Sequence, residues 1–412
     1  MNLNLLAFRN IFRHKRRTLI TASSIAFGVM LSVTFTGSGD YTYTNMIDSG
    51  AKMGMGHVTI QPVGYQQKPT LEKRLQRSDA MMQAAQAESD VVRVMPRIMG
   101  QALFASAHKS VGGAFIAMDP NLEAAANNLF LDALVEGALF TADDRQGVMV
   151  GSKLAEKLKL KVGKKMVYTT TDVHGEITSQ ITRVTGIFQS GIQFVDASMV
   201  LLPLKSTQKT LGYRADEVTL MAVMIDDQRR AKAVRDRLAS LPAMQGSAVL
   251  SWHDSQPDLG GVIAMERGGN VIMQLLIGLL IAAGVLNTML MGVLERKHEF
   301  GMMMAVGMSP AVLFRLVMIE CFWLALLGLL IGIVITAPWY YFLYTTGIDL
   351  SGDLGNGFSY GGVLVAPVFK ARLFPESVVM ILGSVFALAM LAGAWPAWKA
   401  GRTPPIESLK AL

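Results

Sequence analysis

The chain has 412 residues and a formal net charge of +7, with 51% hydrophobic residues but only 17% charged ones. A soluble domain usually carries about 25% charged residues, so this composition indicates a membrane protein. The single cysteine, Cys321, excludes an intramolecular disulfide. The basic residues gather beside apolar segments, as topology signals do, and this disfavours nucleic-acid binding.

The first 17 residues form a predicted cytoplasmic amphipathic helix. Within residues 1–17, apolar side chains recur at helical spacing beside basic ones, which suits a helix lying on an anionic membrane face. Residues 18–37 follow as the first predicted transmembrane helix, since about 19 apolar residues at ~1.5 Å each can cross a ~30 Å hydrocarbon layer. A cleaved signal peptide is the alternative. The apolar run continues through Gly37-Ser38-Gly39-Asp40 into a polar helical segment, so a retained anchor is favoured.

Residues 38–270 form a predicted periplasmic α/β domain with a β-rich insert at about 110–220. The segment from Asp40 to Met55 has no strong helix breaker before Gly54, so it extends the first span as a helix. An amphipathic pattern predicts another helix at Asp227–Leu241. Alternating side chains and turn residues predict strands at His57–Gln61, Val91–Met95, Gln101–Ser106, Gly147–Gly151, Lys165–Thr171 and Gln180–Ile187.

Three further apolar segments are predicted to span the membrane, at 271–294, 312–344 and 377–398. Basic residues flank the connection 295–311 and the tail 399–412, so both termini are expected in the cytoplasm and the loop 345–376 outside. The expected fold is an α-helical membrane protein with four transmembrane helices plus a large mixed α/β extracytoplasmic domain between helices 1 and 2. Its expected location is a bacterial inner membrane.

Asn287 and Glu320 are polar side chains that fall inside the predicted spans. A carboxylate at membrane depth is costly unless it faces protein or water. Glu320 is therefore predicted to mark a helix contact or a functional position, and the contact is favoured.

The sequence contains none of the common catalytic motifs. A phosphate-binding loop needs G-x-x-x-x-G-K-[ST], and the nearest approach, Val162 to Lys165, lacks the first glycine and the hydroxyl residue. The sequence also lacks G-x-S-x-G, H-E-x-x-H and C-x-x-C, and its six histidines are scattered without ligand spacing. We therefore expect a chain that is not an enzyme, with no catalytic residue, metal or cofactor of its own.

Short motifs occur in a characteristic order along nearly the whole chain. They are Ala7–Thr18, Val150–Gly163, Val184–Gly191 with Asp196, Asn287–Met289, Glu295–Arg296, Glu299–Gly301, Ala305–Gly307, Glu320 and Trp395–Ala400 with Pro404, Pro405 and Ile406–Leu409. In order and placement they resemble the FtsX-like/MacB-like (type VII) ABC transporter permeases, and most closely the lipoprotein-releasing LolC/LolE type.

The resemblance implies several partners. It implies a dimer with a second permease, either a second copy or a paralogue, and two copies of a separate ABC ATPase subunit that holds ATP and Mg. It also implies mechanotransmission, in which ATPase motion reaches the periplasmic domains without a channel across the bilayer. A periplasmic lipoprotein carrier or adaptor and membrane lipids are further expected partners, and no nucleic acid is expected.

The connection 295–311 is the predicted coupling element. It begins with charges, has small residues for close approach, and is expected to expose Phe300 and the methionines 302–304, which adapt to irregular partner surfaces. An ordinary loop helix lying on the membrane is the alternative. The predicted coupling residues are Glu295, Arg296, Glu299, Phe300, Gly301, Met304, Ala305 and Gly307.

A substrate cleft is predicted just outside the membrane, between the upper parts of spans one and two of the two protomers. Flexible thioethers suit acyl chains of varied shape, although core filling explains methionines equally well. The predicted lining residues are Met46, Ile47, Met53, Met55, Val262, Ile263 and Met265.

Three functions remain open at this point. The first is extraction or release of lipoprotein from the inner membrane. The second is MacB-like efflux of a drug, peptide or lipid, and the third is FtsX-like regulation of a periplasmic hydrolase without transport. The external segment 38–270 is large for the regulatory branch, which favours the first two.

Overall fold

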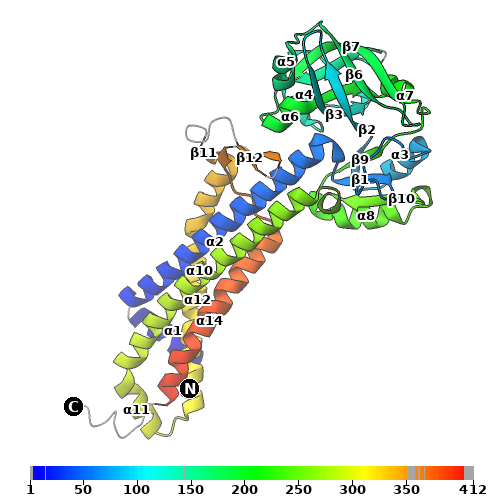
Figure 1. The fold of residues 1–412 in the computed structure, drawn as a ribbon. Helices are drawn as coiled ribbons and strands as arrows, with labels where there is room; N and C mark the ends of the chain where they lie inside the picture. The colour runs from blue at the N-terminus through cyan, green and yellow to red at the C-terminus, as the bar shows by residue number, and fades with distance from the viewer. Residues whose placement is uncertain are drawn as a thin grey trace. The chain divides into compact units, whose positions relative to one another are not determined.

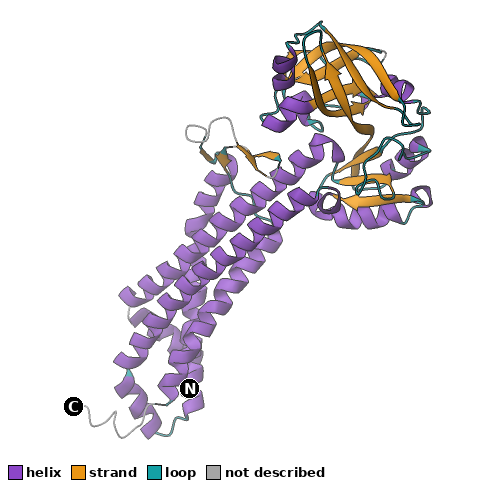
Figure 2. Ribbon diagram, in the orientation of Figure 1, coloured by secondary structure: helices purple, strands orange, loops and turns teal. Residues whose placement is uncertain are grey.

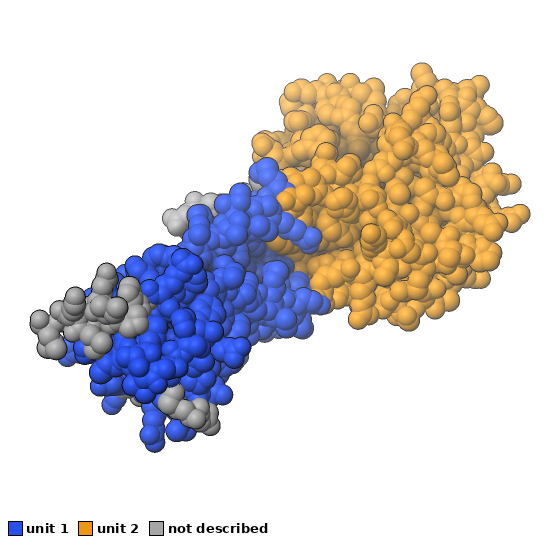
Figure 3. Space-filling model, turned by 90° about the horizontal axis from the view of Figure 1, so that it is seen from below, with its two compact units in different colours: residues 1–41, 265–349, 368–412 blue, residues 42–264, 350–367 orange. Residues whose placement is uncertain are grey.

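The computed structural model describes residues 3–13, 15–142, 144–350, 358–360, 362–365 and 367–402. The chain divides into two compact units (Figure 3). The helical unit comprises residues 1–41, 265–349 and 368–412, and the sheet unit comprises residues 42–264 and 350–367.

The helical unit is built on long apolar helices that lie side by side (Figures 1 and 2). They are α2 (Lys15–Gly50), α10 (Pro257–Glu295), α12 (Pro310–Thr345) and α14 (Pro375–Gly401). All four are long and apolar enough to cross a membrane, and each contains one of the spans predicted from the sequence, although α2 and α10 extend well beyond theirs. Two short helices, α1 (Leu3–Arg13) and α11 (Lys297–Ala305), belong to the same unit.

Small residues allow these helices to approach closely. A Cβ added at Gly328 of α12 would lie 2.7 Å from Cβ of Ile25 in α2, and one at Gly393 of α14 would lie 2.3 Å from Sγ of Cys321. Close backbone approach of this kind is how helices associate in membranes, where burial of apolar surface gives little driving force. The resulting core contains side chains from α2, α10, α11, α12 and α14.

Polar contacts join the same helices near the C-terminal end of α12 and the N-terminal end of α14. Trp339 donates from Nε1 to Oγ1 of Thr34 at 2.9 Å, and Ser377 donates from Oγ to Asp40 at 2.6 Å. These bonds connect α12 and α14 to α2, and they satisfy groups that would be costly to bury alone.

The sheet unit contains a mixed sheet with ten described strands in the order β10-β1-β9-β2-β3-β8-β5-β7-β4, with β6 pairing to both β2 and β7. The strands are β1 (Val58–Pro62), β2 (Val91–Ala105), β3 (Ser110–Met118), β4 (Leu134–Gly137), β5 (Gly147–Gly151), β6 (Lys165–Thr171), β7 (Ile177–Phe188), β8 (Met199–Pro203), β9 (Leu220–Ile225) and β10 (Ser247–Ser251). The helices are α3 (Ser78–Gln86), α4 (Leu129–Asp132), α5 (Ser152–Leu158), α6 (Gln193–Ser198), α7 (Leu204–Leu211), α8 (Ala231–Ala239) and α9 (Trp252–Ser255).

Strand β2 joins two parts of this sheet. The sequence predicts separate strands at 91–95 and 101–106, but the structure shows one strand of 15 residues. Its first half pairs with β9 and its second half with β3 and β6. Pro96 does not break it: Pro96 pairs with Met221 of β9 and lies one residue before the β3 pairing begins at Arg97.

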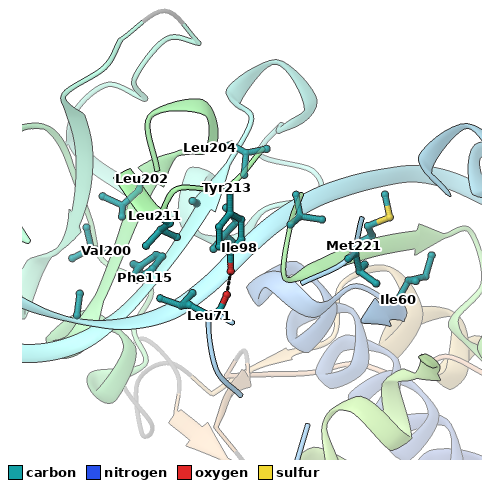
Figure 4. Close-up of a cluster of buried hydrophobic side chains, with 14 of the residues drawn as sticks. Ile60, Leu71, Ile98, Phe115, Val200, Leu202, Leu204, Leu211, Tyr213 and Met221 are labelled. Carbon is teal, nitrogen blue, oxygen red and sulfur yellow. Dashed lines mark hydrogen bonds between the residues drawn. The ribbon is translucent and has the colours of Figure 1, made fainter. Parts of the chain in front are cut away.

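The core of the sheet unit is continuous across both parts of the sheet. Figure 4 shows Tyr213 among Phe115, Leu204 and Leu211, with its hydroxyl donating to the backbone oxygen of Leu71. Burial raises the pKa of Tyr213 far above its ordinary value, so this hydroxyl remains a donor.

Helix α2 ends in a short π-helical segment, η1 (Ala51–Met55). The sequence predicts a helix as far as Met55 with a breaker at Gly54, and Gly54 has φ 135° and ψ −22°. Such a positive φ is readily adopted only by glycine.

The loop between α12 and α14 contains two small two-stranded antiparallel sheets. Strand β11 (Ile348–Asp349) pairs with β14 (Val368–Phe369), and β12 (Phe358–Tyr360) pairs with β13 (Val363–Val365). The predicted loop 345–376 therefore carries some regular structure of its own, although residues 351–357, 361 and 366 lie outside the described part.

Candidate functional site

The predicted coupling element folds as a short helix between two long ones. Helix α11 begins after Arg296 and ends at Ala305. Gly307, at φ 103°, ends the helix, and Met308 donates its backbone N–H to Met303 at 3.0 Å. Pro310 then starts α12 at the position where a missing N–H costs nothing.

One face of α11 is buried and the other is exposed. Phe300 is only 1% exposed and packs in the helical-unit core, and Gly301 is also buried. The expectation that Phe300 is exposed was therefore wrong: a helix lying on a bundle has an inward face, and Phe300 lies on it. Met302 is exposed, Met303 and Met304 are half-buried, and Val306 is 90% exposed.

The exposed residues at the C-terminal end of this element are Met302, Ala305, Val306 and Gly307, which we call the α11 tip. Val306 is not among the coupling residues predicted from the sequence. An apolar side chain at the end of a short helix could have indicated its exposure, but only if the inward face had been known.

The start of α11 is held by charged groups. Arg296 donates from Nη1 to both carboxylate oxygens of Glu320, at 3.0 and 3.1 Å, and from Nε to Glu299 at 2.9 Å. Its guanidinium also lies 5.0 Å from the ring centre of Phe300. Burial opposes the charge of Arg296, but the carboxylates of Glu320 and Glu299 outweigh it and raise the pKa of Arg296.

Residues from the N-terminal part of the chain join this cluster. Asn10 of α1 donates to Oε1 of Glu320 at 2.6 Å. Arg13 pairs with Glu299 at 3.4 Å and Arg17 with Glu295 at 3.5 Å, and both pairs are partly exposed. The structure thus brings together the predicted residues Glu295, Arg296, Glu299 and Glu320. It adds Asn10, Arg13 and Arg17, which the sequence suggested only as surface or topology residues.

Asn287 does not join this cluster. It is exposed on α10, whereas Glu320 lies among α1, α11 and α12. Asn287 and Glu320 therefore belong to different places in the helical unit.

The predicted substrate cleft is largely filled in the single chain. Met46, Ile47 and Ile263 pack with Tyr43 and Leu259 in one buried cluster. These three side chains are buried within this chain, and the cleft between two protomers stays a prediction. Met53, Met55 and Val262 are half-buried, and Met265 is exposed.

Two hollows occur in the sheet unit that the sequence did not suggest. One of about 650 Å³ lies over the face of β2, β3 and β6 and is bordered by Leu103, Ile177 and Phe194. The other, of about 520 Å³, is lined by Tyr65, Leu71, Glu72 and Met99 among others. Both are within the ~300–1,000 Å³ of small-molecule sites. Among the described residues, no group of three His, Cys, Asp or Glu side chains is placed to hold a metal.

Two family models match the chain. The MacB-like periplasmic core domain matches residues 18–241, and the FtsX-like permease C-terminal domain matches residues 271–405.

Named relatives agree with these models at modest identity. The lipoprotein-releasing system transmembrane protein LolC of Xylella fastidiosa is 25% identical over 287 residues, or 64% of each chain. LolE of Haemophilus influenzae is 24% identical over 269 residues, again 64% of each. The chain therefore spans less than two thirds of these relatives. The macrolide export ATP-binding/permease protein MacB of Photorhabdus laumondii is 23% identical over 421 residues, covering 98% of this chain and 60% of that protein.

A solved structure is also similar over part of the chain. The periplasmic region of MacB from Actinobacillus actinomycetemcomitans covers 48% of this chain and 90% of that one, with 15% identity and a TM-score of 0.35. The family models, together with the four membrane-length helices, confirm the resemblance inferred from the motifs. The chain belongs to the FtsX-like/MacB-like (type VII) family of ABC transporter permeases, and it is a multi-pass membrane subunit of that family.

Proposed function

We propose that this permease couples ATP hydrolysis on a separate ATPase to a conformational change of its periplasmic domain, and thereby releases lipoprotein from the inner membrane. In this proposal both termini and α11 face the cytoplasm, and the sheet unit faces the periplasm. Two copies of the ATPase, each holding ATP and Mg, serve a dimer with a second permease.

The observation that carries the coupling step is the α11 tip. Val306 and Met302 expose apolar side chains on a short helix whose other face is fixed in the core by Phe300. An exposed apolar patch on a well-anchored helix is typical of a surface that binds a groove of a partner. The ATPase is the partner that the family resemblance implies, since the sequence contains no phosphate-binding loop.

The likeness to LolC and LolE supports lipoprotein as the substrate. Efflux of a drug, peptide or lipid is the second candidate, because the match to a macrolide exporter covers 98% of this chain. FtsX-like regulation of a periplasmic hydrolase is the third, and the FtsX-like model over residues 271–405 supports it.

The coupling step is tested with the tip. Met302→Asp and Val306→Asp place charges in the proposed interface, and we expect both to abolish co-purification of the cognate ATPase. The control is Met265→Asp, an exposed apolar residue elsewhere in the helical unit. The permease alone is expected to show no ATPase activity. Full ATPase binding by both tip variants would exclude α11 as the docking element.

The substrate is tested in proteoliposomes that contain the permease, its ATPase and a fluorescent triacylated lipoprotein. We expect ATP to move the lipoprotein to a soluble periplasmic carrier. Retention of the lipoprotein together with ATP-dependent movement of a macrolide would favour efflux. Stimulation of a hydrolase without movement of either compound would favour the regulatory function.

A further inference from the structure

Glu320 is the point at which three elements of the helical unit meet. Its carboxylate accepts from Arg296, at the start of α11, and from Asn10 of α1, while Glu320 itself belongs to α12. The Glu320 side chain is 11% exposed and that of Arg296 is 10% exposed. Water therefore reaches little of this pair, and the protein groups supply most of its hydrogen bonds.

The contacts of α1 make this meeting point more than a local ion pair. Ala7 of α1 is fully buried, and the ring of Phe8 lies 5.3 Å from that of Trp323 on α12 in an edge-to-face arrangement. Asn10 follows on the same short helix and reaches Glu320, three residues before Trp323. Helix α1 is therefore held to α12 by packing and by one amide that shares the carboxylate with Arg296.

We propose that Glu320 is a positioning residue that fixes both α11 and α1 to α12, so that the N-terminal helix moves together with the coupling helix. The proposal rests on the proposed function only for the ATPase that would drive this motion. We call the contacts of Glu320 with Arg296 and Asn10 the Glu320 joint, and all of them lie within this chain.

The charge of Glu320 gives the joint its strength. Arg296 uses Nη1 for Glu320 and Nε for Glu299, so one guanidinium bridges α12 to the first turn of α11 in a fixed geometry. If Glu320 is removed, a buried guanidinium keeps a single carboxylate partner and Asn10 loses its acceptor. Both α11 and α1 should then become mobile together.

The test measures distances between pairs of spin labels in the full-length permease, in a Cys321→Ser background. One pair joins Leu5 on α1 to Leu330 on α12, and the other joins Met302 on α11 to Leu330; all three positions are exposed. In the labelled protein that keeps Glu320, we expect both distance distributions to be narrow. With Glu320→Ala we expect both distributions to broaden.

Two matched variants make the result specific. Asn10→Ala removes only the α1 contact, so the Leu5 distribution should broaden and the Met302 distribution should not. Glu295→Ala removes an exposed pair with Arg17 and should broaden neither. Unchanged distributions in a folded Glu320→Ala protein would overturn the proposal, and so would broadening of equal size in Glu295→Ala.

The double variant Arg296→Met with Glu320→Leu distinguishes a positioning role of Glu320 from a role in stability alone. Replacing a buried ion pair by apolar side chains often preserves stability. We expect this protein to fold and bind the ATPase while both distributions stay broad. Narrow distributions in the double variant would show that packing alone holds the helices and would overturn the proposal. If Glu320→Ala does not fold, the double variant and Glu320→Gln carry the test.

The ATPase measurement shows whether the joint matters for coupling. With the cognate ATPase bound, we expect permease stimulation of hydrolysis in Glu320→Gln to fall roughly 5-fold or more, at the low end of allosteric coupling. Unchanged stimulation would overturn the link between joint and coupling. Failure of the unaltered permease to bind any ATPase would instead refute the proposed function, and the distance results would still decide the joint.

Discussion

Two arginine–glutamate pairs lie buried in the two units of this permease, and they are built differently. In the sheet unit, Arg97 is 0% exposed and donates from Nη2 alone to Glu123, at 2.8 and 3.0 Å. Its Nε and Nη1 have no hydrogen-bond partner among the described residues. In the helical unit, Arg296 uses two different nitrogens for two carboxylates on different elements.

The difference separates a pair that stabilises one place from a pair that joins several. Glu123 is also held by Asn128, which caps α4, so the side-chain hydrogen bonds of Arg97 stay within β2 and the segment after β3. Burial lowers the pKa of Arg97, which shows how costly its charge is in that core. Burial alone therefore does not identify a positioning residue. The number of elements that share the charge does.

The largest effect is expected when the Arg97–Glu123 pair in the sheet unit is broken. Glu123→Ala leaves Arg97 buried without a counter-charge, and removal of one partner from a buried pair costs about 3–5 kcal/mol. Hydrogen exchange of β2 in the full-length protein should accelerate accordingly. Arg97→Met combined with Glu123→Leu should return the exchange close to its original rate. Slow exchange in Glu123→Ala would mean that Arg97 finds water or another acceptor.

A second prediction compares the two pairs by replacing each arginine, Arg296 or Arg97, with lysine. Lysine offers a point charge and cannot bridge two carboxylates as a guanidinium does. Arg296→Lys should lose a charged hydrogen bond, about 1.5–3 kcal/mol, whereas Arg97→Lys should lose about 1 kcal/mol because Arg97 uses a single nitrogen. Hydrogen exchange of α11 and of β2 measures the two effects. Equal losses would contradict the distinction drawn here.

Exposed pairs beside the Arg296 cluster should matter least in energy. Arg17 and Glu295 are partly exposed and 3.5 Å apart. Such pairs contribute about 0–1 kcal/mol, so Glu295→Gln should change thermal stability little. A loss comparable to that of Glu320→Ala would mean that the whole cluster acts as one unit.

A surface cluster in the sheet unit gives a pH-dependent counterpart. Hydrogen bonds from Arg237 and Arg230 lower the pKa of Asp90 below its ordinary value of about 3.9. The folded state then holds the proton less tightly than the unfolded state, so the stabilisation is present above about pH 4 and is lost as the pH falls through the lowered pKa. Asp90→Asn should therefore lower the melting temperature at pH 7 and make little difference at strongly acid pH. A constant difference across this range would exclude titration of Asp90 as the cause.

Local signals predicted the elements well, and contacts between distant residues limited the rest. The apolar lengths located four membrane helices, and alternation located strands such as Lys165–Thr171 with its bounds unchanged. Alternation could not show that β2 is one strand, because Pro96 and Gly100 resemble breakers until the pairing with β3 is known. Nor could it show that Phe300 faces inward, because that depends on partners such as Leu313 in another helix.

The charge clusters could be predicted only in part, because their members come from distant parts of the chain. Glu320 was noticeable because a carboxylate is rare at membrane depth. Its partner Asn10 lies near the other end of the chain, and no spacing rule connects the two. Arg97 and Glu123 gave no signal at all, since single charged residues in a soluble domain usually lie on its surface.

The shared strand β2 also has a consequence for how the sheet unit is made. Strand β1 begins at Val58, but one of its partners, β9, ends at Ile225, and the other, β10, follows still later. The segment from β3 to β8 is therefore synthesised before β9 and β10, the two strands that pair with β1. Until β9 and β10 have been synthesised, β1 and the first half of β2 lack these partners, and long-range pairing of this kind is slow. A chaperone that covers strand edges would act most usefully on residues 58–62 and 91–97.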